Sequence, residues 1–205
     1  MLQLRPFRTG DESALAEICI RTADAGADAT GILADDAIWP AVFVLPYVAR
    51  HPDLAFVVED EDGRPVGYVV GTDDTAAFED WFAHTWWPER GAGWPKPRQE
   101  RTPSTRAQTR QDGVLTYAYG RRAGAEPYGR EHPAHLHIDL LPEAQGEGWG
   151  RRLIDAFVAA VRARGVTGLH LAADTTNTGA LRFYDRLGFT RVPSHAGVQA
   201  FTLDL

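Results

Sequence analysis

The chain has 205 residues, of which 44% are hydrophobic and 10% aromatic, and its formal net charge is −7 at pH 7. A chain of this length buries one sizeable core, so we expect a single domain over residues 1–205, and the acidic balance argues against a nucleic-acid partner. No run approaches about eighteen apolar residues and the N-terminus lacks a basic-then-apolar signal pattern, which predicts a soluble, cytoplasmic protein without a membrane partner.

The first segment predicts a strand followed by a helix. Residues 2–7 have strand character, and Thr9 or Asp11 in the following turn can cap a helix over about 12–23. Cys19, the single cysteine, falls on the apolar side of this helix. A buried thiol is therefore expected, and a disulfide framework is excluded.

The next segment predicts a broken helix and a hairpin. Residues 35–50 are helical in pattern but contain two prolines, so the helix should bend or break. Residues 54–58 and 66–71 are strands joined at Asp62-Gly63, a strong turn signal. Aromatic residues recur at four-residue spacing in the broken helix: Trp39, Phe43 and Tyr47.

Residues 75–130 divide into an aromatic part and a basic part. The first part is helical in spacing and far too aromatic for a solvent face, with Phe78, Trp81, Phe82, Trp86 and Trp87. Residues 91–130 carry eight Lys or Arg against three acids, a local charge of +5, so the rest of the chain is −12. The eight are Lys96, Arg98, Arg101, Arg106, Arg110, Arg121, Arg122 and Arg130.

The last third alternates strands and helices. A strand over 135–141 ends at Pro142, and a helix over 151–164 ends at Gly165. A strand over 169–173 then precedes a helix that Asn177 or Thr178 caps and Gly188 ends, with two final strands at about 192 and 198–205. This order predicts an α/β layered domain with a mixed sheet.

The loop between residues 141 and 151 has the composition of an anion site. Gln145, Gly146, Gly148 and Gly150 join a strand to a helix, where glycines allow a ligand close to backbone N–H groups at the helix N-terminus. No Lys-Ser or Lys-Thr pair follows, which excludes the nucleotide-hydrolase phosphate loop, and the glycines fall at every second residue, which excludes the dinucleotide fingerprint.

The remaining pattern, Gln-x-x-Gly-x-Gly, resembles the acetyl-CoA signature of the GNAT superfamily of N-acetyltransferases. The stretch DTTNTGALRFYDRLGF, residues 174–189, resembles the second signature of that family. The resemblance implies a mixed, mostly antiparallel sheet of about seven strands flanked by helices and splayed between its fourth and fifth strands. It also implies acetyl-CoA as cosubstrate, a primary amine of a small molecule or protein as acceptor, and no metal.

The hairpin and the residues after it resemble one branch of this superfamily in particular. DLAFVVEDEDGRPVGYVVGTDD with AAFEDWF looks like the acetyltransferase-like domain at the C-terminus of O-GlcNAcase, regarded as a pseudo-acetyltransferase with a degenerate acetyl-CoA loop. Gln145, Gly148 and Gly150 are kept here, which favours an enzyme over the alternative, a catalytically inactive acyl-CoA-binding or protein-interaction domain. Against a minimal acetyltransferase, residues 75–130 are an insertion on the substrate side. Its basic part would face CoA phosphates, an acidic substrate or solvent, and the broken helix either packs in the core or lines the substrate cleft.

Backbone N–H groups of the glycine loop should hold the CoA pyrophosphate. The resemblance to GNAT proteins also implies a bulge in the fourth strand that presents an N–H near Leu140 to the thioester oxygen. The expected cofactor contacts are Leu140, Leu141, Gln145, Gly146, Gly148, Trp149, Gly150, Arg151, Asn177 and Tyr184.

Tyr184, two helical turns after Asn177, is the expected general acid for the departing CoA thiolate. The general base is open: Asp139 is the first choice and Asp74 the second. His135 and His137 share a strand face with Asp139, and a structural Asp139–His pair is expected there rather than catalysis by either histidine. With His132 nearby, only two of the three histidines share a face, so no metal site is expected. The sequence identifies neither the acceptor nor the oligomeric state.

Overall fold

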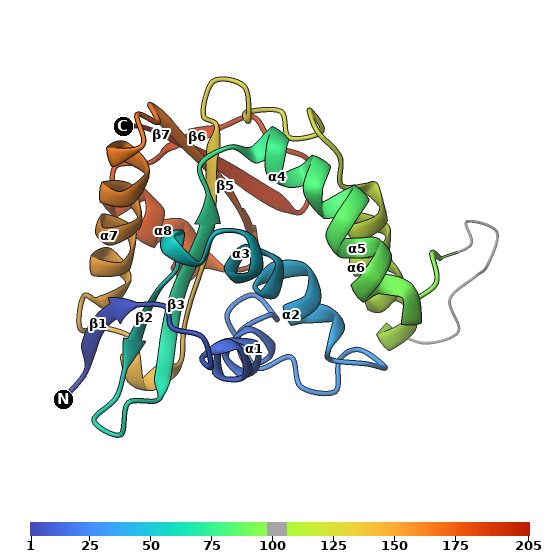
Figure 1. The fold of residues 1–205 in the computed structure, drawn as a ribbon, viewed down its shortest axis with the longest axis horizontal. Coiled ribbons are helices and arrows are strands. Elements are labelled where there is room, and N and C mark those ends of the chain that lie inside the picture. The colour runs from blue at the N-terminus through green and yellow to red at the C-terminus, as the bar shows by residue number, and fades with distance from the viewer. Residues whose placement is uncertain (98–105) are drawn as a thin grey trace.

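The computed structural model describes residues 1–97 and 106–205. Its centre is a seven-stranded sheet with strand order β1-β2-β3-β4-β5-β7-β6, in which only the pair β4–β5 is parallel (Figure 1). The strands are β1 Gln3–Pro6, β2 Phe56–Glu59, β3 Pro65–Thr72, β4 Ala134–Leu140, β5 Gly168–Asp174, β6 Thr190–Val192 and β7 Val198–Asp204. The mixed, mostly antiparallel sheet expected from the sequence is confirmed.

Helices cover both faces of this sheet. They are α1 Glu12–Ile20, α2 Ile38–Phe43, α3 Leu45–Arg50, α4 Thr75–Trp81, α5 Trp87–Arg90, α6 Arg106–Gly120, α7 Trp149–Ala163 and α8 Thr178–Arg186. A π-helical turn, η2 Phe82–Trp86, joins α4 to α5, and short 3-10 turns occupy Pro52–Leu54, Gly91–Gly93 and Pro142–Ala144.

One face packs on α7 and the other on α1 and α3 (Figure 1). The strongly amphipathic α7 buries Leu153, Phe157 and Val161 against β2, β3 and β4. Its approach is close: a Cβ on Gly71 of β3 would lie 2.5 Å from the Phe157 ring. Only glycine fits there, so this contact fixes the spacing between α7 and the sheet.

The broken helix and the hairpin are confirmed, and the capping of α1 is not. Asp11 occupies the N-cap position but makes no side-chain cap bond. Its carboxylate instead accepts hydrogen bonds from Arg5 at 2.7 and 2.9 Å and from the backbone N–H of Arg8. Arg5 also pairs with Glu59, so a buried charge network across β1 and β2 takes the aspartate away from the helix end.

Residues 75–130, called the substrate-side segment below, are more helical than expected. Residues 106–120 form α6, a helix that the sequence analysis did not predict. Arg98 and Arg101 of the basic run lie outside the described residues. Arg121, counted with that run, is only 5% exposed and lies inside the molecule, because its guanidinium pairs with the equally buried Glu79 of α4.

The splay between β4 and β5 is confirmed, but its cause differs from the expected bulge. The two strands pair only at Ala134↔Leu169 and His135↔His170. Beyond those pairs β5 continues along β7, while β4 stays in unbroken register with β3 through six residue pairs. The strands separate because each follows its outer neighbour, without an extra residue in β4.

The buried Arg121–Glu79 pair joins the two parts of the segment 75–130, and Arg121 also contacts residues outside that segment. Arg121 also donates to the Val42 carbonyl at 3.0 Å and lies 3.9 Å from the centre of the Phe82 ring. Replacing it with methionine leaves Glu79 buried without a partner, so Arg121→Met should cost about 3–5 kcal/mol in the free energy of unfolding, measured by urea denaturation. Arg191→Met, which removes an exposed pair with Asp185, is the control and should leave the unfolding midpoint unchanged. Equal effects of the two variants would contradict this role.

Candidate active site

A cavity of about 770 Å³ lies where β4 leaves β5. Its walls come from the end of β4, the glycine loop, α8 and the turn after α1. They include nine of the twelve expected site residues: Asp139, Leu140, Gln145, Gly146, Gly148, Gly150, Arg151, Asn177 and Tyr184. The structure therefore brings the two sequence signatures together around one space.

The glycine loop has the backbone conformation that its sequence predicts. Gly146 and Gly148 have φ of +84° and +83°, a region that side chains rarely adopt, and Gly148 is the N-cap of α7. No side chain caps this helix, so its first N–H groups face the cavity with the positive end of the helix dipole. Gln145 closes the loop by donating to the Leu140 carbonyl at 2.8 Å.

Two further backbone donors come from β4. The N–H of Leu141 donates to the Val66 carbonyl of β3 at 2.9 Å. Since N–H groups alternate in direction along a strand, those of Leu140 and Ile138 face away from β3, toward the opening left by β5. The Leu140 N–H is therefore aimed as expected, without a bulge, and both residues line the cavity.

Tyr184 reaches the cavity from α8. Its ring is 93% buried among Phe183, Phe189 and Phe201, and its hydroxyl makes no hydrogen bond to any described residue. Burial, and then the charge of Asp139, raise the pKa of the phenol above its ordinary value. The hydroxyl is thus held as a proton donor with a free position for a partner.

Asp139 lies on the same cavity wall. Its carboxylate accepts a hydrogen bond from the Tyr68 hydroxyl at 2.5 Å, and burial raises its pKa. The expected structural pair with a histidine is wrong: on the shared strand face, His135 and His137 both contact Tyr47 of α3 instead.

Asn177 both caps α8 and lines the cavity. Its side chain caps α8 by accepting from the N–H of Ala180 at 2.9 Å, which decides between it and Thr178. It also lines the cavity and packs on Gly26, where an added Cβ would lie 3.1 Å from the Asn177 amide nitrogen.

Three expected residues lie elsewhere. Asp74 caps α4 by accepting from Ala77 N–H, beyond the end of β3 that pairs with the start of β4, so it is far along the strand from Leu140. Leu141 is 1% exposed with its N–H bonded to β3, and Trp149 packs its ring inward. None of the three lines the cavity.

The turn after α1 contributes residues that the sequence reading missed. Thr22, Ala25 and Gly26 line the cavity opposite α8, and Ala25 has an unusual φ of +53°. The run of small residues at 23–29 was the available signal, because small side chains leave room for a ligand. α8 adds Phe183 and Arg186.

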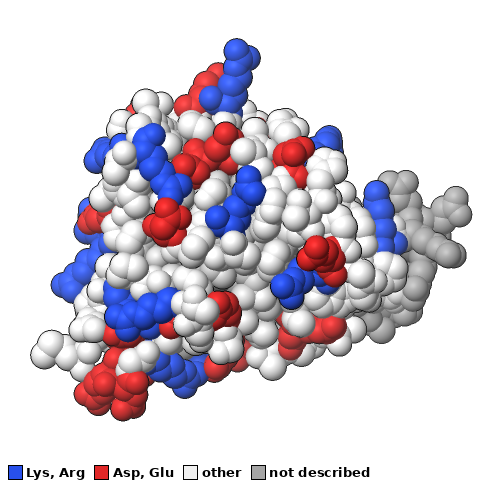
Figure 2. Space-filling model, in the orientation of Figure 1, with Lys and Arg blue, Asp and Glu red and all other residues white. Residues whose placement is uncertain are grey.

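The basic residues do not form one patch in the described part of the chain. Arg110 contacts Asp24 at 3.4 Å and Arg121 is buried, while Arg151 and Arg186 are the cations that line the cavity. Figure 2 shows positive and negative side chains intermixed over one face of the molecule. Backbone groups and these two arginines are thus what the cavity offers to an anionic ligand.

Two other properties concern ligands and membranes. Within residues 1–97 and 106–205, no three His, Cys, Asp or Glu side chains gather as a metal site would require. No helix in that part of the chain has both the length and the apolar character needed to cross a bilayer.

The profile of the acetyltransferase (GNAT) family matches residues 27–189. This chain belongs to that family. A mycothiol acetyltransferase of Thermobispora bispora is 48% identical over 81 residues, covering 38% of this chain and 28% of that protein. Another, from Rhodococcus erythropolis, is 32% identical over 120 residues, covering 53% of this chain and 40% of that protein. The GNAT chain thus aligns with less than half the length of these relatives.

Solved structures agree with the family. The crystal structure of SsHAT is 37% identical, with a TM-score of 0.87, and the match covers 99% of this chain and 98% of that one. The putative acetyltransferase yncA of Salmonella typhimurium, solved with its cofactor acetyl-CoA, has a TM-score of 0.55 at 17% identity over 100% and 94% of the two chains. The latter likeness supports the fold alone.

The glycine loop gives a direct test of the cavity. A Cβ on Gly148 meets no atom within 4 Å and would project into the space left for a ligand, besides straining a backbone at positive φ. Gly148→Ala should therefore weaken CoA binding about tenfold or more, by calorimetric titration, because its methyl group would occupy space beside the α7 N-terminus. Gly63→Ala, equally strained at φ +80° but in the β2–β3 turn, should keep the CoA affinity. An unchanged affinity in Gly148→Ala would remove the loop from the binding site.

Proposed function

We propose that this GNAT protein transfers the acetyl group of acetyl-CoA to a primary amine. The observation that carries the proposal is the single cavity in which the α7 N-terminus, the free N–H groups of β4 and the Tyr184 hydroxyl meet. The α7 N–H groups bind the pyrophosphate, assisted by Arg151, and the pantetheine arm lies in the opening between β4 and β5. No metal takes part in the proposed reaction.

The acceptor enters from the other end of the same opening. A second cavity of about 540 Å³ continues along β4 at Leu136 and His137 and along β5 at Leu171 and Ala172. The first cavity ends on β4 at Ile138, one residue away. A thioester carbonyl held by the N–H of Leu140 or Ile138 would therefore lie between a cofactor space and an acceptor space.

The chemistry follows from this order. The amine nitrogen attacks the thioester carbon, and the oxygen gains negative charge that the β4 N–H groups stabilise. The carbon–sulfur bond then breaks, and the Tyr184 hydroxyl gives its proton to the departing sulfur. Water could donate the proton in place of an exposed phenol, whereas Tyr184 is almost fully buried and water has little access to it.

Asp139 acts on the cofactor side in this proposal. It lines the first cavity and is absent from the walls of the second, so it does not contact an amine held there. Its charge raises the pKa of Tyr184, and Tyr68 fixes its position. We therefore assign it to holding the Tyr184 end of the site and not to removing the amine proton.

The acceptor of this chain is not given by its relatives. The curated relatives are mycothiol acetyltransferases, but each is matched over less than half of its length. The stretches that resemble the acetyltransferase-like domain of O-GlcNAcase support a similar domain in our proposal. That domain has a degenerate acetyl-CoA loop, whereas this chain keeps Gln145, Gly148 and Gly150.

Tyr184→Phe tests the proposal. Removing the hydroxyl should lower amine-dependent release of free CoA thiol from acetyl-CoA by about 10²- to 10⁴-fold, while CoA affinity stays within about twofold. Tyr119→Phe, whose hydroxyl bonds the Trp94 carbonyl outside both cavities, is the matched control and should release thiol at the wild-type rate. CoA binding without amine-dependent thiol release in the wild type would make the protein an acyl-CoA-binding domain and not an enzyme.

A further inference from the structure

The second cavity holds a chain of hydrogen bonds whose proton positions are fixed by its last member. Thr75 Oγ1 lies 2.7 Å from the Pro133 carbonyl, which has no proton to give, so the threonine hydroxyl donates there. The same oxygen lies 2.8 Å from His135 Nδ1. Since the hydroxyl proton is already used, His135 must donate from Nδ1 to Thr75.

The pattern continues through Tyr47. A neutral His135 that carries its proton on Nδ1 has a lone pair on Nε2, which lies 2.8 Å from the Tyr47 hydroxyl. Tyr47 therefore donates to His135 and has no proton left. Its oxygen also lies 3.1 Å from His137 Nε2 and accepts from Arg121 at 3.2 Å, so His137 donates from Nε2.

This leaves one nitrogen with a free lone pair. His137 Nδ1 makes no hydrogen bond to any described residue, and it is absent from the polar atoms that are both buried and unpartnered. The residue lines the second cavity, next to the β4 position where the first cavity ends. Burial, and then the charge of Arg121, lower the pKa of His137 to about 3, and burial lowers that of His135 as well. Both rings are therefore neutral near pH 7.

The walls of the second cavity indicate what kind of acceptor fits there. Around His137 the walls are aromatic: Phe43 lies 5.6 Å from its ring, ring centre to ring centre, and stacks on Tyr117 at 5.7 Å. The hydroxyl of Tyr128 donates to the Pro193 carbonyl at 2.5 Å, which ties the end of the substrate-side segment to the β6–β7 turn.

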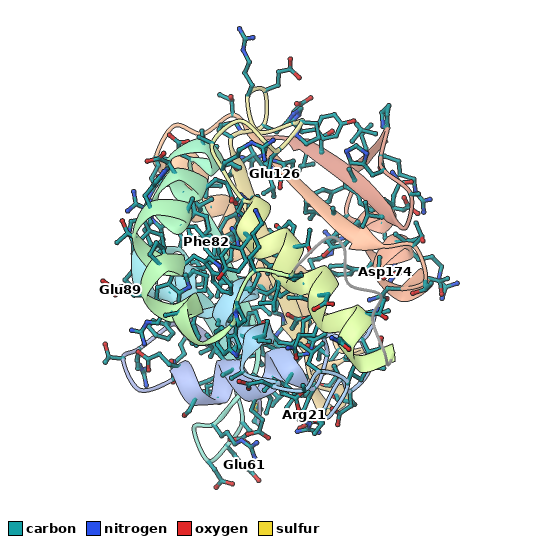
Figure 3. The ribbon with its side chains drawn as sticks, turned by 90° about the vertical axis from the view of Figure 1, so that its right-hand side faces the viewer. Arg21, Glu61, Phe82, Glu89, Glu126 and Asp174 are labelled. Atoms are coloured by element: carbon teal, nitrogen blue, oxygen red, sulfur yellow. The ribbon has the colours of Figure 1, made fainter. Side chains whose placement is uncertain are left out.

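Two carboxylates line the cavity, and only one is available. Glu79 is held by both guanidinium contacts of Arg121. The carboxylate of Glu126 forms no hydrogen bond or ion pair with the described residues, and burial, then the charge of Glu79, raise its pKa. Figure 3 shows Glu126 between the helices of the substrate-side segment and the C-terminal strands. An acceptor with a cationic group would give this carboxylate the partner it lacks.

We propose that His137 Nδ1 is the general base of the acetyl transfer and that Tyr47 is the positioning residue that fixes its tautomer. Glu126 selects acceptors that have an aromatic or apolar body and a second cationic group. This proposal rests on the proposed function. As the amine nitrogen forms its bond to the carbonyl carbon it becomes positively charged, so its N–H becomes acidic enough for a weak imidazole base. The amine proton passes to Nδ1, and the electron pair of the carbon–sulfur bond leaves with sulfur, which takes the Tyr184 proton. His137 then releases its proton to solvent, and Tyr184 regains one from solvent.

The tautomers provide a test that needs no activity. Long-range ¹H–¹⁵N spectra of ¹⁵N-histidine-labelled protein at pH 7 should show His137 as the Nε2–H form and His135 as the Nδ1–H form, with His137→Gln and His135→Gln assigning the signals. Tyr47→Phe removes the acceptor of the His137 proton, so His137 should become a mixture of the two forms. A His137 that is Nδ1–H or doubly protonated in the wild type overturns the proposal, whether or not the protein turns over.

The kinetic test separates the base from its support. His137→Gln keeps a donor toward Tyr47 but has no basic nitrogen, so kcat should fall about 10²- to 10⁴-fold with the KM for acetyl-CoA unchanged. Tyr47→Phe should lower kcat about tenfold or less, because part of the His137 population would still carry its proton on Nε2 and keep Nδ1 free. Activity retained in His137→Gln overturns the assignment, whereas a wild type without thiol release from any amine contradicts the proposed function instead.

Acceptor selection is tested with three amines: p-xylylenediamine, benzylamine and putrescine. The wild type should prefer p-xylylenediamine over benzylamine about tenfold in kcat/KM through its charged bond to Glu126, and over putrescine through the aromatic walls. Glu126→Gln should bring the first ratio close to one, while the exposed Glu131→Gln should leave it unchanged. A ratio near one in the wild type, or one that survives Glu126→Gln, overturns this part.

Discussion

The site depends on the early end of pairing between β4 and β5. After two residue pairs, β5 follows β7 and β4 follows β3, so the sheet opens while each strand keeps its outer hydrogen bonds. A sheet otherwise satisfies its backbone groups internally, and unpaired buried N–H groups are costly. Here the opening leaves donors at Ile138 and Leu140 that face away from β3. Both cavities lie along this one opening, and in the proposed reaction the cofactor and the acceptor meet there.

The parts of the site that the sequence predicted are those with local causes. Gly146 and Gly148 adopt positive φ because their neighbours on both sides are already committed to a strand end and a helix start. Asn177 caps its helix through an N–H three residues away, and Tyr184 follows on the same helix. Such features depend on spacing within about ten residues, which a single sequence states directly.

The failures have distant causes. Asp11 was expected to cap α1, but Arg5 of β1 binds its carboxylate, and Asp74, the second choice for the general base, caps α4 instead. Arg121 was counted with the basic run, but in the structure it is buried because it pairs with Glu79, 42 positions earlier in the chain. The bulge was an inference from other family members, and β4 has none in its pairing with β3 because parting from β5 needs none. Strand alternation placed His135, His137 and Asp139 on one face correctly, but Tyr47, about 90 positions from His137, decides what the histidines do.

The substrate-side segment gives the acceptor end its character. Its helices α4 and α6 meet through the Arg121–Glu79 pair, which consumes one cavity carboxylate and leaves Glu126 unpaired. The same guanidinium donates to Tyr47, and after burial its charge is the second cause that lowers the pKa of His137. The residues that hold this segment together therefore also contact the hydrogen-bonded chain of the second cavity.

The most direct measurement of the central claim is amide hydrogen exchange with and without CoA. If the opening between β4 and β5 holds the cofactor, CoA should slow exchange at Ile138, Leu140 and the first turn of α7, and leave the β2–β3 hairpin unchanged. Slowing confined to other segments, or none at saturating CoA, would contradict the account.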